Sequence, residues 1–220
     1  MLLLLAAITI HTNFEGGSLG RVEQVTPAHF RCHVAGQSDQ DGRNRQADWY
    51  YFRVDGAKGQ QLTLDLVSLP GEYNYRPTRG AVTKDTIPVF RDGEGGWKHF
   101  PSIDFDAAEP RLRVRITPAS DRFWVAHVAP YTLASYTAMM SEVGAHNALK
   151  QETIGKSVES RDLPLLTIGS FKPGVKVIWL MFRQHAWETG SSWVAEGAIR
   201  FLLSEDPATG RILQHAVVKI

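Results

Sequence analysis

A histidine and a glutamate three residues apart, His185 and Glu188, are the residues of this sequence best suited to chemistry. They follow the apolar segment 175–182 and precede a segment with helical periodicity. Polar residues at the carboxyl end of a buried strand are where α/β folds place their sites. An imidazole and a carboxylate that both reach across such a turn can bind one cation, and zinc accepts this pair in tetrahedral geometry. The spacing therefore predicts two ligands of a zinc site.

The same pair also has a purely structural interpretation. An acidic side chain is favourable near the N-terminus of a helix, and Glu188 occupies such a position. His185 is then a hydrogen-bonded loop residue. Spacing and position alone leave both interpretations open.

The other histidines offer no better metal cluster. His29 and His33 flank Cys32, but a single cysteine does not make a structural zinc site of the usual kind. His215 lies within 212–220, which we predict to be a buried strand, so we expect a hydrogen-bonded core histidine there. Three others show no partner pattern: His99, His127 and His146.

The elements around the pair predict an α/β layer. The run VKVIWLMF over 175–182 is nearly continuous in apolar residues, which is typical of a central strand buried on both faces. A helix is predicted over 192–204, followed by a second buried strand over 212–220, and strand–helix–strand at this spacing indicates a parallel crossover. The helix carries one apolar stripe: Trp193, Val194, Gly197, Ala198, Phe201 and Leu202.

Three further elements precede this crossover. Residues 131–143 have apolar residues at helical spacing, and 153–158 and 163–170 are predicted strands. A parallel sheet needs both faces covered, and two predicted helices are few for that purpose. We therefore expect the α/β part to be an incomplete first half that ends at Ile220.

The first 130 residues predict an antiparallel β-sandwich. Segments 49–54, 62–66 and 112–116 alternate apolar and polar residues, which half-buried strands require. Glycine-containing turns separate the short strands, and helical periodicity is absent there. The sequence thus predicts an α+β protein of two domains, a β-sandwich over 1–129 and an α/β domain over 130–220.

Composition restricts the partners and leaves the compartment open. A formal charge of +1 indicates neither nucleic acid nor an anionic membrane as a partner, and no apolar stretch reaches the length of a membrane span. Residues 1–7 are apolar and have two interpretations, part of an export signal or the start of a strand over 3–12. A cytoplasmic and an exported location both remain open.

The segment RQHAWETGSSWVAEGAIRFLL over 183–203 resembles the first zinc motif of the carboxypeptidase A-like zinc metallocarboxypeptidases. It is most similar to the cytosolic-type subgroup, with its Arg-x-His-Pro-Gly-Glu and Ser-Ser-Trp pattern. Segments 48–54 and 129–132 resemble a strand of that subgroup's β-sandwich and the entry to its peptidase domain. The resemblance implies zinc as the cofactor, with His185 as the first ligand and Glu188 as the second. It implies hydrolysis at the C-terminus of a peptide or protein and places Arg183 in the motif without a role.

Two departures from the subgroup's pattern limit which properties of the family can be expected of this sequence. Ala186 and Trp187 replace Pro-Gly, which keeps the ligand spacing but places the subgroup's glutamate specificity in doubt. The family's third histidine ligand and catalytic glutamate come from later in the chain, so we expect them beyond residue 220 and expect this fragment to be inactive. No catalytic or substrate-binding residue is assigned. The alternative function is a β-sandwich binding module with a vestigial peptidase remnant.

Overall fold

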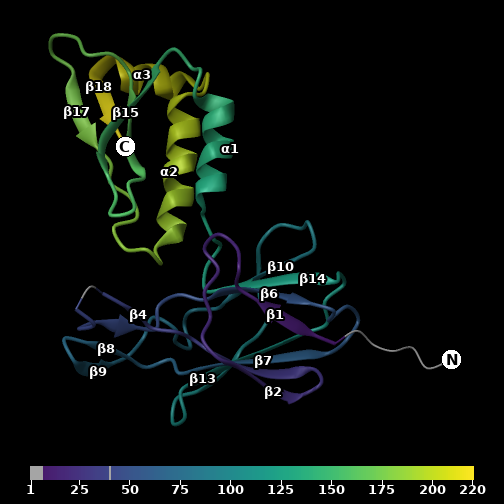
Figure 1. Cartoon of the computed structure of the whole chain (residues 1–220). Helices are drawn as coiled ribbons and strands as arrows, with labels where there is room; N and C mark the ends of the chain where they lie inside the picture. The colour runs from purple at the N-terminus through teal and green to yellow at the C-terminus, as the bar shows by residue number, and fades with distance from the viewer. Residues whose placement is uncertain (1–6, 40) are drawn as a thin grey trace. The chain divides into compact units, whose positions relative to one another are not determined.

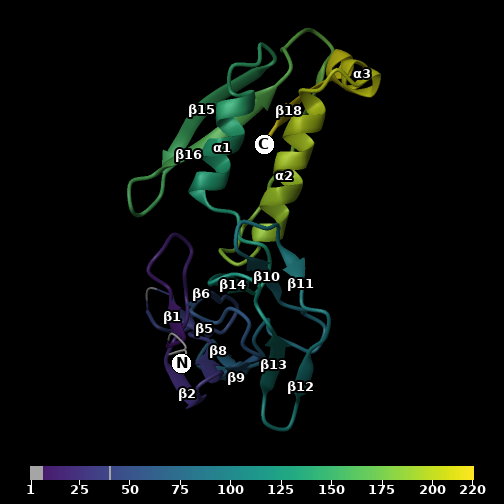
Figure 2. The same cartoon turned by 90° about the vertical axis from the view of Figure 1, so that its right-hand side faces the viewer.

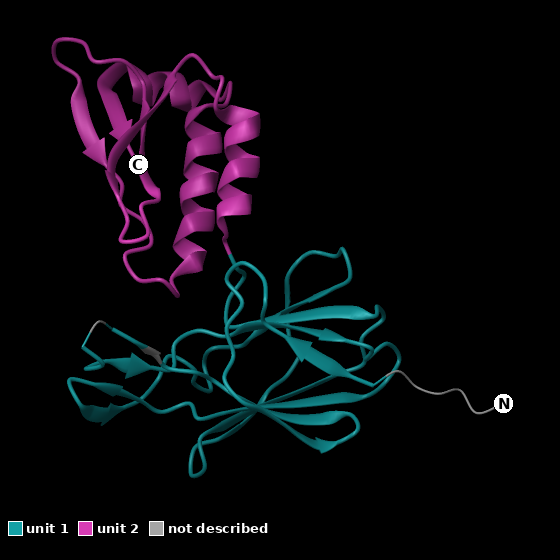
Figure 3. Ribbon diagram, viewed as in Figure 1, with its two compact units in different colours: residues 1–130 teal, residues 131–220 magenta. Residues whose placement is uncertain are grey.

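The computed structural model describes residues 7–39 and 41–220, drawn in Figure 1 and, turned by 90°, in Figure 2. These residues form two compact units, one ending at Pro130 and the next beginning at Tyr131, which Figure 3 colours separately. Residues 1–6, which hold most of the predicted export signal and the start of the strand predicted over 3–12, lie outside the described residues. The described part of that strand is β1 (Thr9–His11).

Unit 1 consists of two main sheets that form a β-sandwich (Figure 1). Within the described ranges, the first sheet has the order β1-β6-β14-β10-β11 and the second has the order β12-β13-β7-β3-β2. The first sheet adds to β1 the strands β6 (Tyr51–Asp55), β10 (Val89–Asp92), β11 (Lys98–His99) and β14 (Arg122–Ala126). The second contains β2 (Val22–Thr26), β3 (His29–His33), β7 (Leu62–Val67), β12 (Asp104–Asp106) and β13 (Arg111–Ile116). A smaller sheet pairs β4 (Gln37–Ser38), β5 (Arg45–Gln46), β8 (Gly71–Tyr73) and β9 (Arg76–Thr78).

The predicted alternation accounts for the core between the two main sheets. Three residues of segment 50–54 are fully buried on one side of the first sheet: Tyr50, Phe52 and Val54. Leu62, Leu64 and Leu66 of β7 are equally buried and belong to the same apolar cluster. The β-sandwich prediction is confirmed, and its strands pair antiparallel except for β3 and β7, which run parallel.

A buried charge network lies on the second sheet. The carboxylate of Asp65 on β7 is almost completely buried and accepts two hydrogen bonds from Arg113 on β13, at 2.5 and 2.8 Å. His29 Nε2 on β3 lies 2.9 Å from the second carboxylate oxygen. Burial alone raises the pKa of Asp65, but the hydrogen bonds from Arg113 and His29 outweigh that effect and lower the pKa. The network therefore links three adjacent strands through an ionised carboxylate.

Unit 2 is a four-stranded sheet with helices on it. Within the described residues the strand order is β15-β16-β18-β17, and Figure 1 shows α1 and α2 on the same side of the strands. Met139 of α1, Ile199 of α2 and Val218 of β18 are buried in one apolar cluster. The elements are α1 (Leu133–Val143), β15 (Leu149–Lys156), β16 (Asp162–Ile168), β17 (Lys176–Trp179), α2 (Thr189–Leu202), α3 (Pro207–His215) and β18 (Ala216–Lys219). No helix among the described residues is long and apolar enough to cross a membrane.

The crossover that contains the predicted site is present, because β17 and β18 pair in parallel and α2 and α3 connect them in the chain. The prediction that 175–182 forms a central strand buried on both faces is wrong. In the described residues β17 covers four positions at the edge of the sheet, and all four side chains are exposed. The sequence pattern indicates how apolar a strand is, but the burial of the strand depends on the strands and helices beside it. Here β18 is the strand that pairs with β17.

The buried face of helix α2 only partly overlaps the predicted apolar stripe. It begins at Thr189, directly after Glu188, rather than at residue 192. Of the predicted stripe, Trp193, Val194 and Phe201 are exposed but Leu202 is buried. Ile199, which is outside the predicted stripe, is buried as well. The helix carries apolar residues on two faces, and the sheet and α1 cover only the face that contains Ile199.

The predicted buried strand over 212–220 begins too early. Residues 207–215 form α3, whose N-cap Asp206 accepts a hydrogen bond from Ala208 N at 2.7 Å, with Pro207 in the first turn. His215 is the last residue of this helix and is exposed, so the prediction of a core histidine is wrong.

Candidate metal centre

The loop between β17 and α2 brings the two predicted ligands together. His185 Nδ1 lies 2.7 Å from Glu188 Oε1, and the second carboxylate oxygen of Glu188 accepts a hydrogen bond from His185 N at 3.1 Å. The His185 side chain is 67% exposed and that of Glu188 is 32% exposed, so an ion from solvent can reach the pair. The two side chains therefore face each other at the turn, a geometry compatible with both interpretations of the pair.

The backbone of the loop explains this convergence. Glu188 is the N-cap residue of α2, but its side chain makes no capping hydrogen bond and instead faces His185. The main-chain N–H of Glu188 donates to His185 O at 3.1 Å, which closes a tight turn between the two residues. Ser191 in the first turn of α2 donates its hydroxyl to Glu188 O at 2.8 Å.

Arg183 makes contacts that the sequence did not indicate. Its φ of +52° is in the left-handed region, which costs a non-glycine residue about 1–2 kcal/mol. Its main-chain N–H donates to Ser191 Oγ at 2.9 Å. Its guanidinium donates to two carbonyl oxygens, from Nη1 to Tyr131 O at 2.7 Å and from Nη2 to Ala186 O at 2.9 Å. The resemblance places an arginine at this position, and these backbone partners are visible only in the fold.

The charge state of Glu188 suits a cation ligand. Hydrogen bonds from the His185 ring and from the His185 main chain lower the pKa of the Glu188 carboxyl. The carboxyl group is therefore ionised at neutral pH, as metal coordination requires.

The donor set also fits zinc, which binds imidazole nitrogen and carboxylate oxygen at about 2.0–2.2 Å. Two such ligands in tetrahedral geometry lie about 3.3 Å apart. The observed 2.7 Å between His185 Nδ1 and Glu188 Oε1 is shorter than this separation because the two groups hydrogen-bond to each other directly. Among residues 7–39 and 41–220, no group of three or more His, Cys, Asp or Glu side chains could hold a metal ion.

The expected acceptor for the second ring nitrogen of His185 was not found. We expected a carbonyl or carboxylate beside it, as metal-binding histidines usually have. The hydrogen bond that the His185 ring makes within the described residues is the one from Nδ1 to Glu188. The loop leaves the rest of the ring exposed, which explains the missing acceptor.

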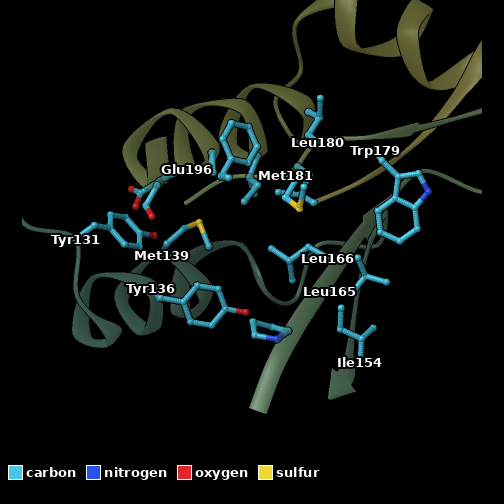
Figure 4. Close-up of a pocket in the computed structure, with 16 residues that line it drawn as sticks. Tyr131, Tyr136, Met139, Ile154, Leu165, Leu166, Trp179, Leu180, Met181 and Glu196 are labelled. Atoms are coloured by element: carbon cyan, nitrogen blue, oxygen red, sulfur yellow. The ribbon is translucent and has the colours of Figure 1, made fainter. Parts of the chain in front are cut away.

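An apolar hollow of about 340 Å³ lies within unit 2, and the close-up in Figure 4 shows its lining. Tyr136 and Met139 from α1 face Leu165 and Leu166 from β16 across it (Figure 4). Neither His185 nor Glu188 is among its lining residues. The hollow therefore has the character of an apolar packing space, and the candidate metal ligands lie at the exposed loop.

Comparison with known proteins identifies both units. Residues 10–128 match the family model of the cytosolic carboxypeptidase N-terminal domain, and residues 136–220 match the zinc carboxypeptidase family model. An uncharacterized protein of Zymomonas mobilis is 28% identical over 94% of this chain and 50% of its own length. Cytosolic carboxypeptidase 6 of Mus musculus is 27% identical over 97% of this chain and 41% of its own. The chain thus spans about half the length of these relatives.

A solved structure agrees with this relationship at the level of the fold. A metallo-carboxypeptidase from Burkholderia cenocepacia superimposes with a TM-score of 0.82 and 23% identity, over 97% of this chain and 55% of that one. The first family model alone covers more than half of the sequence, and the second covers most of unit 2. The chain therefore belongs to the zinc carboxypeptidase family, in its cytosolic carboxypeptidase branch.

Proposed function

We propose that this chain supplies two zinc ligands, His185 and Glu188, to a metallocarboxypeptidase that hydrolyses C-terminal peptide bonds. The observation that carries the proposal is the convergence of His185 Nδ1 and Glu188 Oε1 at the β17–α2 loop. This loop lies within the segment that matches the zinc carboxypeptidase family model. A zinc ion bound there supplies Lewis acidity and lowers the pKa of a bound water molecule.

The chain's own residues have distinct tasks in this proposal. His185 donates a neutral imidazole nitrogen, and Glu188 donates a carboxylate that is already ionised because its pKa is lowered. The exposure of the loop allows a peptide C-terminus to approach the same face. The peptide is the expected partner, and the third ligand and the general base are proposed to lie outside residues 1–220.

The proposed location of the third ligand and the general base outside residues 1–220 has a testable consequence for the 220-residue protein. Two ligands without a third histidine and a base cannot hold and activate water in the manner of a catalytic zinc site. We therefore expect weak zinc binding and no peptidase activity from residues 1–220. Zinc-dependent release of C-terminal residues from a peptide by this protein would show that the remaining catalytic groups lie within it.

The metal ligands can be tested by a zinc titration of the purified protein, followed through the imidazole NMR signals of its histidines. We expect the His185 signals to shift, and we expect His185→Asn and Glu188→Gln each to weaken binding by about tenfold or more. His215→Gln is the matched control, because His215 is exposed in the same unit and lies outside the loop. Equal zinc affinity of the wild type and His185→Asn would refute the assignment.

A further inference from the structure

The structure assigns Arg183 as a positioning residue that holds the β17–α2 loop in the conformation in which His185 and Glu188 face the same ion. The role of the pair as zinc ligands is the function proposed above, and this inference rests on it. The position of Arg183 two residues before the first ligand places its backbone at the entrance of the loop.

The backbone of Arg183 sets the direction of the loop. Its left-handed φ of +52° turns the chain directly before the ligands, in a conformation that needs support from its surroundings when the residue is not glycine. Ser191 provides part of that support. Its hydroxyl oxygen accepts a hydrogen bond from Arg183 N, and its hydroxyl group donates a hydrogen bond to Glu188 O. One side chain thus joins the beginning of the loop to its end.

The guanidinium holds the middle of the loop. Nη2 donates to the carbonyl of Ala186, which lies between the two ligands, and Nη1 donates to the carbonyl of Tyr131, 52 residues earlier in the chain. The planar guanidinium fixes the directions of these donors, so the position of one carbonyl determines that of the other.

The anchor at Tyr131 is itself held in place by packing. The Tyr131 side chain is buried, and its ring packs edge-on against Trp193 of α2 with the ring centres 4.9 Å apart. The next residue, Thr132, is the N-cap of α1 and forms a reciprocal capping box with Ser135. Arg183 therefore ties the loop to the fixed start of a helix.

The contacts of Arg183 favour a conformational role over a neutralising one. Among the described residues no carboxylate lies within ion-pair distance of its guanidinium, and its hydrogen bonds go to main-chain carbonyls and to Ser191. A lysine at this position keeps the charge, but its single ammonium group lacks the fork that joins two separate carbonyls. Arg183→Lys therefore separates the effect of the charge from the effect of the geometry.

The test uses the 220-residue protein and two NMR measurements. The first is the heteronuclear NOE of the amides at 184–188 without metal, which reports the order of the loop. The second is the zinc dissociation constant from the His185 imidazole signals. The variants are Arg183→Met and Arg183→Lys, and the matched control is Arg161→Met, which removes an exposed arginine paired with Glu159 in the same unit.

We expect Arg183→Met to lower the loop NOE values and to raise the zinc dissociation constant about tenfold, the scale typical of groups that orient metal ligands. Arg183→Lys should lower the NOE of the Ala186 amide and raise the constant by a smaller factor, and Arg161→Met should change neither. If Arg183→Met fails to fold, Arg183→Lys decides alone. Unchanged NOE values in the folded variants overturn the positioning role, even if zinc binding weakens. If Arg183→Met lowers the loop NOE values but the His185 signals of the wild type do not respond to zinc, the positioning role is retained. That outcome refutes the metal site instead.

Discussion

His127 is a buried histidine whose protonation opposes folding, which predicts a specific sensitivity of unit 1 to acid. It follows β14, its side chain is 1% exposed, and its ring packs edge-on against Tyr50 with the ring centres 5.6 Å apart. Its main-chain N–H donates to Tyr50 O at 3.0 Å. Burial lowers the pKa of His127 from 6.5 to about 4. The folded protein therefore binds this proton only below about pH 4, whereas the unfolded chain binds it near pH 6.5.

The sign and the size of the effect follow from this difference. The stabilisation from the neutral ring is fully present above about pH 6.5 and decreases as the pH falls toward about 4, because the unfolded state takes up the proton first. One pKa unit corresponds to about 1.36 kcal/mol. Between about pH 7 and pH 4.5, linkage through His127 alone should lower the free energy of unfolding by about 2.4 kcal/mol.

Urea unfolding followed through the amide signals of β6 and β7 measures this quantity for unit 1. His127→Phe keeps an aromatic ring beside Tyr50 but cannot titrate, so its loss of stability between pH 7 and pH 4.5 should be about 2.4 kcal/mol smaller than that of the wild type. His99→Gln removes an exposed histidine of the same unit and should behave like the wild type. The same pH dependence in His127→Phe and the wild type, or a His127 ring signal that titrates near pH 6.5, would refute the reasoning.

Two further stability predictions concern one site in each unit. Arg113→Met leaves the buried Asp65 carboxylate without its bidentate partner and should lower the free energy of unfolding of unit 1 by about 3 kcal/mol, measured by urea unfolding, with Arg111→Met as the more exposed control. Thr132→Ala removes the side-chain acceptor of the capping box of α1 and should destabilise unit 2 by about 1 kcal/mol, measured by thermal unfolding, whereas no loss in Thr132→Ala would show that Ser135 caps the helix alone.

The reliability of the sequence predictions depended on whether the relevant partners are local. The alternation of Leu62, Leu64 and Leu66 specified a face, and any sandwich partner buries that face, so the prediction held. Burial of 175–182 depended on strands on both sides, and the run of apolar residues contains no information on whether those strands are present. Helix α3 was detectable, because Asp206 followed by Pro207 is a local N-cap and first-turn signal. The strand predicted over 212–220 took no account of this signal.

The residues of the candidate site were also predictable only where their partners are local. His185 and Glu188 are three residues apart on one tight turn, so their proximity depends on a local backbone path that their spacing indicates. Arg183 acts through the carbonyl oxygens of Tyr131 and Ala186, and a carbonyl oxygen is present in every residue. No pattern of side chains can therefore mark its partners in advance. At this loop, the two candidate ligands could be proposed from the sequence, whereas the main-chain contacts of Arg183 became visible only in the fold.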